Sequence, residues 1–162
     1  MPTSSRAIAI AIALYGWMSM AATVQAADAP AAPVYDADLA RSVGANENGM
    51  RQYVFVLLKT GPTPMPKGPE RDEMFKGHFA NMERLAKAGK LAVAGPFDGV
   101  DGWRGMFVFA VKDIEEAKAL VATDPVVIQG EMVPEFHAFF GSAALMLVPD
   151  AHKRISKPTP AE

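Results

Sequence analysis

The sequence of 162 residues contains no cysteine. This absence excludes disulfide bonds, thiol nucleophiles and zinc-thiolate sites, but it leaves the cellular compartment open. The charges nearly balance, with 16 Lys and Arg against 18 Asp and Glu, and no basic patch stands out. Nucleic acid is therefore not an expected partner. The Gly-x-Ser-x-Gly, P-loop and dinucleotide-binding motifs are also missing, so no nucleotide cofactor is predicted.

The N-terminus carries the only information on compartment. Arg6 precedes an uncharged run over residues 7–27, and Val24-Gln25-Ala26 places small residues where a signal peptidase reads them. These features predict a signal peptide over residues 1–26, cleaved near Ala26, and hence a periplasmic or secreted protein. An uncleaved membrane anchor is the alternative, because the run is just long enough to span a bilayer. Otherwise we expect contact with the membrane only through the signal peptide before cleavage.

The rest of the chain divides into three parts. Residues 27–49 show no sustained periodicity and predict a flexible leader, residues 50–148 predict a folded domain, and residues 149–162 predict a loose polar tail. Hydrophobic patterns in the domain predict four strands and two helices. The strands are expected at 51–59, 91–94, 106–111 and 131–140, the helices at 70–88 and 114–123, and turns or loops at 60–69 and 98–105.

This order of strand, helix, strand, strand, helix, strand predicts an α+β domain of the ferredoxin-like class, with one antiparallel sheet and both helices on one face. The strands at 51–59 and 106–111 are apolar on both faces, so the face without helices also needs a cover. A second copy of the chain is the simplest cover, which predicts a homodimer through the open sheet face. Residues 142–148 are the alternative cover.

Two ionisable residues fall on the apolar faces of the predicted helices. His78 lies 11 residues before the Gly89 helix stop, and Asp124 lies 11 residues after the Asp113 N-cap. At about 1.5 Å per residue, both residues lie ~16 Å along their helix axes from the same end of the sheet. Because packed helix axes lie about 8–10 Å apart, the two side chains can meet. A carboxylate beside imidazole favours the charged ring and fixes its tautomer, which suits a general acid or base. The alternative is a satisfied core histidine beside a bracing aspartate.

The turn at 98–105 adds two candidate substrate-binding residues. Arg104 could hold an anionic substrate and Trp103 could form the wall of a pocket, whereas the alternative is an exposed turn with one packed aromatic ring. His137 and Glu135 share a strand face, but the sequence offers no compact third ligand. No metal site is therefore predicted.

Three segments carry a resemblance to a known family. They are His78-Phe79-x5-Leu85-x3-Gly89-x-Leu91, then Ala94-Gly95-Pro96-Phe97, and then Glu116-Ala117-x2-Leu120-Val121-x2-Asp124-Pro125 followed by Gly130. In this order and at these distances, the chain from about residue 50 to 140 resembles the YCII-related (YciI-like) family.

The resemblance implies a dimeric α+β barrel in which two sheets pack face to face. It also implies an active-site pair formed by a histidine on the first helix and an aspartate before proline, which match His78 and Asp124. Acid–base chemistry on small, often aromatic or cyclic substrates, including elimination, is the implied activity. The predicted signal peptide would place this chain in a secreted subgroup, so a cytoplasmic role is not implied.

Two functions are compatible with these features. The first is a small-molecule enzyme of the cell envelope that uses His78 and Asp124 for elimination or isomerisation without a cofactor. The second is a non-catalytic dimeric module of the periplasm that binds a small ligand or a partner protein, in which the same pair is structural. A haem- or oxygen-using relative with the same barrel is disfavoured, because the sequence offers no dedicated ligand set.

Overall fold

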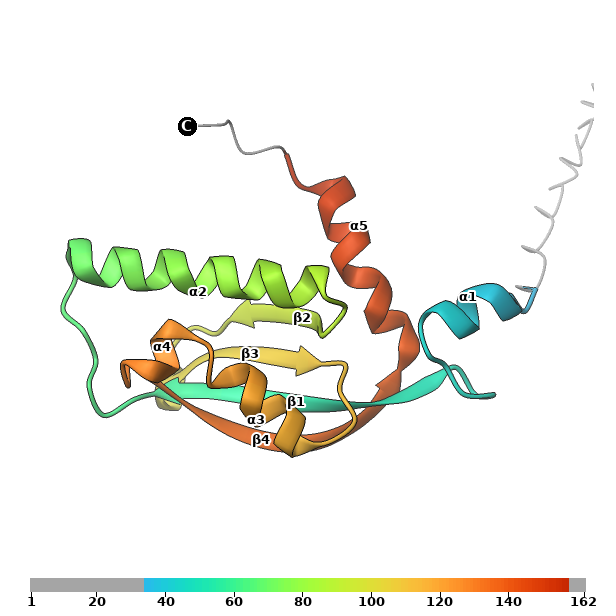
Figure 1. The fold of residues 1–162 in the computed structure, drawn as a ribbon, viewed down its shortest axis with the longest axis horizontal. Helices are drawn as coiled ribbons and strands as arrows, with labels where there is room; N and C mark the ends of the chain where they lie inside the picture. The colour runs from blue at the N-terminus through green and yellow to red at the C-terminus, as the bar shows by residue number, and fades with distance from the viewer. Residues whose placement is uncertain (1–33, 158–162) are drawn as a thin grey trace, which may run out of the picture. The chain divides into compact units, whose positions relative to one another are not determined.

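Four strands form one antiparallel sheet within residues 34–157, the part of the chain that the computed structural model describes (Figure 1). The predicted signal peptide lies outside these residues. The strands are β1 (Met50–Thr60), β2 (Leu91–Pro96), β3 (Trp103–Phe109) and β4 (Met132–Ser142). Their spatial order is β2-β3-β1-β4, and each neighbouring pair is antiparallel. This confirms the predicted α+β class and its antiparallel sheet. Pro134 lies in β4, which is an outer strand of the sheet, where a residue without an N–H group is tolerated.

Five α-helices and two 3-10 segments complete the described chain. They are α1 (Ala37–Ser42), α2 (Pro69–Lys87), η1 (Val100–Gly102), α3 (Ile114–Val121), α4 (Pro125–Ile128), η2 (Ala143–Leu147) and α5 (Val148–Ile155). Figure 1 shows α2 running along one face of the sheet. The predicted N-cap of α3 is confirmed, since the Asp113 carboxylate accepts a hydrogen bond of 2.9 Å from the Glu116 N–H.

The main core lies between the helices and one face of the sheet. Alternate residues of β1 point into it because successive side chains of a strand lie on opposite faces. Its fully buried members come from β1 and β3 and from α2, α3 and α4: Val54, Val56, Leu58, Phe107, Phe109, Met74, Leu85, Ala117, Val121 and Val126. Burying a side chain of this size contributes about 1.5–3 kcal/mol of hydrophobic stabilisation. This core therefore holds α2 and α3 on the same side of the sheet.

The second sheet face has a smaller cluster of its own. Tyr53 and Val108 are buried there, and Leu145 and Met146 of η2 pack against this cluster. Residues 142–148 therefore cover part of this face. They were the predicted alternative to a cover by a second copy of the chain. The rest of this face along β4 stays open. Phe139 and Val133 lie there and are 37% and 40% exposed.

Two segments within or next to the predicted leader and tail are helical. Residues 37–42 form α1, whose N-cap Asp36 accepts from the N–H groups of Asp38 and Leu39. Residues 148–155 form α5, which has a proline in its first turn. Both helices are shorter than nine residues, so neither presents enough turns for hydrophobic periodicity to be recognised.

Two boundaries near the candidate site also differ from expectation. The turn predicted over 98–105 is limited to its first part, because Gly99 and Gly102 take positive φ angles around η1 and the chain then enters β3 at Trp103. The helix expected to reach Thr123 ends at Val121, and the chain turns into α4. Trp103 and Arg104 are therefore strand residues, and Asp124 caps a separate short helix.

Candidate functional site

His78 and Asp124 form a buried pair. The His78 Nδ1 lies 2.9 Å from each Asp124 carboxylate oxygen. The histidine is 7% exposed and the aspartate 1%. His78 projects from the middle of α2, whereas Asp124 is the N-cap of α4 and also accepts a 3.2 Å hydrogen bond from the Val126 N–H. The contact predicted from the two helix registers is thus present, although Asp124 reaches it from a different helix.

A glycine beside the histidine allows the two helices to approach closely. A Cβ atom added at Gly77 would lie 3.0 Å from the Pro125 Cγ, which is tighter than ordinary van der Waals contact. Gly77 precedes His78, and Pro125 follows Asp124. The close contact between α2 and α4 therefore sets the separation of the acid–base pair.

The hydrogen bonds determine the tautomer of the ring. An ionised carboxylate can only accept, so Nδ1 must carry the proton that it donates to Asp124. The lone pair is then on Nε2, which has no hydrogen-bond partner within residues 34–157. The rings of Phe75, Phe79 and Phe107 surround the imidazole at centroid distances of 5.8, 5.4 and 6.0 Å. The second ring nitrogen of His78 therefore lies in an aromatic setting.

The two candidate substrate-binding residues have partners of their own. The Trp103 ring is 42% exposed and packs edge-on against Phe97 at 5.6 Å. Arg104 sits at a register shift between β1 and β3, and its Nη2 donates to the Glu131 carboxylate at 3.2 Å. No hydrogen bond joins either residue to His78 or Asp124 in the described part of the chain.

The sequence did not single out Glu131, which is the centre of a second buried cluster. Its carboxylate is 1% exposed and accepts from the Met65 N–H at 2.6 Å, from Arg71 at 2.8 Å and from Arg104. Burial acts to raise the pKa of Glu131, but these hydrogen bonds and the Arg71 charge together hold it below its usual value. The position of Glu131 directly before the apolar residues of β4 was the available signal.

The two clusters meet at one aromatic ring. The Arg71 guanidinium lies 4.5 Å from the centroid of the Phe75 ring, a cation–π contact. Phe75 in turn packs edge-on against His78 at 5.8 Å. Because Arg71, Phe75 and His78 are successive members of one face of α2, the Glu131 cluster holds the helix that positions His78.

Two surface pockets lie beside this region. One of about 540 Å³ is lined by α2 and α4 and includes Met74 and Pro125. The other, of about 420 Å³, lies between α2, β2 and α5, and Phe79 is part of its wall. Each pocket therefore borders a residue next to the pair, but neither is lined by His78 or Asp124 themselves.

Two further properties concern residues 34–157 alone. No group of three or more His, Asp and Glu side chains there is arranged to hold a metal ion. No helix in that range has both the length and the apolar character needed to cross a membrane.

Comparison with known proteins identifies the family. The YCII-related domain matches residues 52–134, just over half of the 162-residue chain. The matched range runs from β1 to the start of β4 and includes both members of the buried pair. No curated protein matches the chain. On the strength of the domain match, the chain belongs to the YCII-related family.

Proposed function

We propose that this protein is a small-molecule enzyme of the YCII-related family in which His78 is the general acid and base. The buried His78–Asp124 pair is the observation that supports this proposal. A histidine held by a carboxylate at one nitrogen keeps its other nitrogen for the substrate. The family match covers both residues.

In the proposed reaction, Nε2 of His78 removes a proton from a carbon atom next to an activating group such as a carbonyl. The electron pair of that C–H bond then expels a leaving group or shifts the double bond, which gives elimination or isomerisation. Asp124 stabilises the imidazolium through Nδ1 and keeps the ring oriented. Return of the proton to water or to the product restores the base. The proposed steps require no cofactor.

The surroundings of the pair fit a small aromatic or cyclic substrate. Phe75, Phe79 and Phe107 supply an aromatic wall, and aromatic rings favour stacked or edge-on partners. Trp103 and Arg104 remain the proposed substrate-binding residues, with Arg104 offering an N–H toward an anionic group while Glu131 orients it. We further propose a ferredoxin-like homodimer, in a secreted subgroup of the family, that works in the cell envelope after removal of residues 1–26.

The enclosure of the histidine favours a second candidate function. With its side chain only 9% exposed, His78 resembles a structural core residue, and structural ion pairs are as well formed as catalytic ones. The second candidate is therefore a non-catalytic dimeric module of the periplasm that binds a small ligand or a partner protein. In that case the pair contributes stability alone.

Solvent deuterium exchange tests the proposal without knowledge of the full reaction. Small aromatic and cyclic carbonyl acids are incubated with the full-length protein in D2O, and proton NMR follows loss of the signal of the acidic C–H. A general base accelerates such exchange by about 10²–10⁴-fold. We expect exchange with at least one compound, and we expect His78→Asn to abolish it.

His137→Asn is the matched control. His137 also contacts a carboxylate, Glu135, at 2.8 Å, but its side chain is 52% exposed. Exchange should therefore survive this substitution. If His78→Asn leaves exchange unchanged, His78 is not the base. If no compound exchanges and His78→Asn only lowers the melting temperature, the pair is structural and the binding module is favoured.

A further inference from the structure

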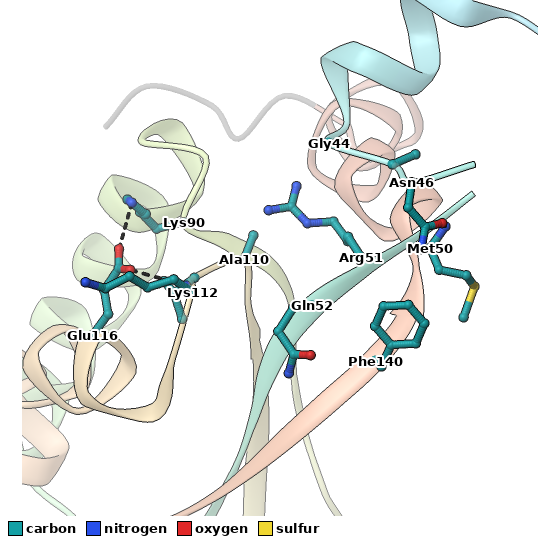
Figure 2. A pocket seen from close by; sticks show the side chains of 12 residues that line it. Gly44, Asn46, Met50, Arg51, Gln52, Lys90, Ala110, Lys112, Glu116 and Phe140 are labelled. Atoms are coloured by element: carbon teal, nitrogen blue, oxygen red, sulfur yellow. Dashed lines mark hydrogen bonds and ion pairs between the residues drawn. The ribbon is translucent and has the colours of Figure 1, made fainter. Parts of the chain in front are cut away.

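A cationic pocket lies at the opposite end of β1 from the Glu131 cluster (Figure 2). Its volume is about 600 Å³, and it is bounded by the turn after α1, the start of β1 and the segment between β3 and α3. The charged residues that line it are Arg51, Lys90, Lys112 and Glu116. Three cations thus face one carboxylate, although the whole chain carries a net charge of −2.

Arg51 presents an unpaired N–H group in this pocket. Its Nη1 donates to the Val43 carbonyl at 2.7 Å, and its guanidinium lies 5.2 Å from the centroid of the Tyr53 ring. Nε is enclosed by protein atoms and has no partner among the described residues. No hydrogen bond from Nη2 is found among them either, so Nη2 is the group that a carboxylate or phosphate in the pocket can reach.

Gly44 sets the position of this side chain. It has a φ of +66°, and a Cβ atom there would come within 3.1 Å of Nη1. The guanidinium therefore packs directly against the backbone of the turn. In Figure 2 it extends from β1 into the space between that turn and the Lys90–Glu116 pair. Nη1 alone braces the turn, so this structural role does not account for Nη2.

The two lysines add charge at the far side of the pocket. Lys90 is 2.8 Å from Glu116, which neutralises one positive charge. The Lys112 ammonium is 78% exposed and 3.8 Å from Asp113, a distance at which an exposed ion pair is weak. Arg51 and Lys112 therefore remain available to an anion. Phe140, which is 56% exposed, forms an apolar part of the same wall.

We propose that this pocket binds a small organic anion, with its carboxylate or phosphate on Nη2 of Arg51 and its apolar part against Phe140. Lys112 supplies a second positive charge. The site has no lining residue in common with the His78–Asp124 pair. It is thus a separate binding site, and it holds whether or not His78 is catalytic.

NMR titration of the full-length protein tests this site. The side-chain Nε–H signal of Arg51 is followed while phenyl phosphate, benzoate or inorganic phosphate is added. We expect saturable shifts with phenyl phosphate or benzoate, and the tighter of the two identifies the head group. Inorganic phosphate should bind more weakly because it makes no contact with Phe140. Equal affinity for inorganic and phenyl phosphate would overturn the assignment of the apolar part.

Substitutions locate the binding. Arg51→Gln should raise the Kd about tenfold, as expected for loss of a charged hydrogen bond; its binding is followed through the backbone amide of Gly44. Lys112→Gln, at an exposed side chain that does not threaten folding, should raise the Kd about threefold. Lys76→Gln is the control, since it makes the same charge change on an exposed part of α2 and should leave the Kd unchanged.

Two results would overturn the proposal. One is the absence of saturation with all three probes. The other is an equal loss of affinity in Lys76→Gln and in the two pocket variants, which would mean that the anions respond only to the net charge of the protein.

Discussion

At the level of single residues, two buried carboxylates have different partners. Asp124 binds the His78 imidazole, whereas Glu131 binds two guanidinium groups and a backbone N–H. Both are 1% exposed, so each would be costly to bury alone. Glu131 pairs with permanent charges and therefore stays ionised. Its role is to hold Arg71 and Arg104, and through Arg71 the face of α2 that carries His78.

Removal of the Glu131 charge should destabilise the fold. Glu131→Gln keeps the shape of the side chain but leaves two guanidinium groups without a counter-charge. We expect a loss of about 2–4 kcal/mol in the free energy of unfolding, measured by urea denaturation. Glu83→Gln is the control, because Glu83 pairs with Lys87 at 2.7 Å while 66% exposed. That substitution should cost much less, because an exposed ion pair adds little to stability.

The ionised Glu131 also predicts that the free energy of unfolding depends on pH. The pKa of Glu131 is lowered from 4.5 in the folded chain, so the folded state binds fewer protons than the unfolded state as the pH falls. Its stabilisation is complete above pH 4.5 and is lost as the pH falls through the lower folded pKa. The difference in unfolding free energy between the wild type and Glu131→Gln should therefore shrink on acidification. A difference that grows toward low pH would contradict this.

For the stability of the protein, the close contact at Gly77 should outweigh the low helix propensity of glycine. Gly77→Ala would gain up to about 1 kcal/mol in an unrestricted helix, but the new methyl group meets Pro125. We expect a net destabilisation of about 1 kcal/mol. In a Pro125→Ala background, where the contact is removed, the same substitution should stabilise. Melting temperatures of the four proteins in this double-mutant cycle measure the coupling.

At the level of elements, two helices share the same type of N-cap but differ in what they bury. Asp113 caps α3, which buries Ala117 and Val121, whereas Asp36 caps α1, which buries no residue. A capping bond stabilises the whole protein only when its helix is part of the cooperative core.

Substitution of the two caps should separate these roles. Asp113→Ala should lower the free energy of unfolding by about 1 kcal/mol. Asp36→Ala should leave it unchanged, while hydrogen exchange at the amides of α1 becomes faster. Equal losses in urea denaturation would show that α1 unfolds together with the sheet.

At the level of the whole molecule, the proposed homodimer depends on the part of the second sheet face that η2 leaves open. Val133 and Phe139 lie on that face and are 40% and 37% exposed. Exposed apolar side chains on a sheet are typical of a contact surface. The area open to a second chain is smaller than a wholly uncovered sheet face would offer, because η2 covers one end of the face.

The proposed homodimer should therefore depend on β4. Val133→Asp should convert the dimer into a monomer in sedimentation velocity, because it replaces an apolar contact at the interface with a charged group that must lose its hydration. Val100→Asp, at a residue that is 62% exposed outside the sheet, should leave the mass unchanged. A wild-type protein that sediments as a monomer at all concentrations would rule out the homodimer.

Much of this protein follows from the sequence alone. Short apolar runs define the strands, the 3.6-residue period defines α2, and Asp113 marks the start of α3. These signals are local, because propensity, pattern and capping act over a few residues. The depth of His78 and Asp124 along two antiparallel helices also indicated that the two side chains can meet, although Asp124 lies at the start of α4 and not on α3.

Only the tertiary structure decided how the site is assembled. Glu131 could not be linked to Arg71, 60 positions earlier, because a long-range ion pair leaves no periodic trace in the sequence. The Arg51 pocket likewise joins four distant segments of the chain. The short helices α1 and α4 begin at aspartate N-caps, and α4 also packs against α2. Such contacts depend on how the elements pack, and packing is a property of the folded chain as a whole.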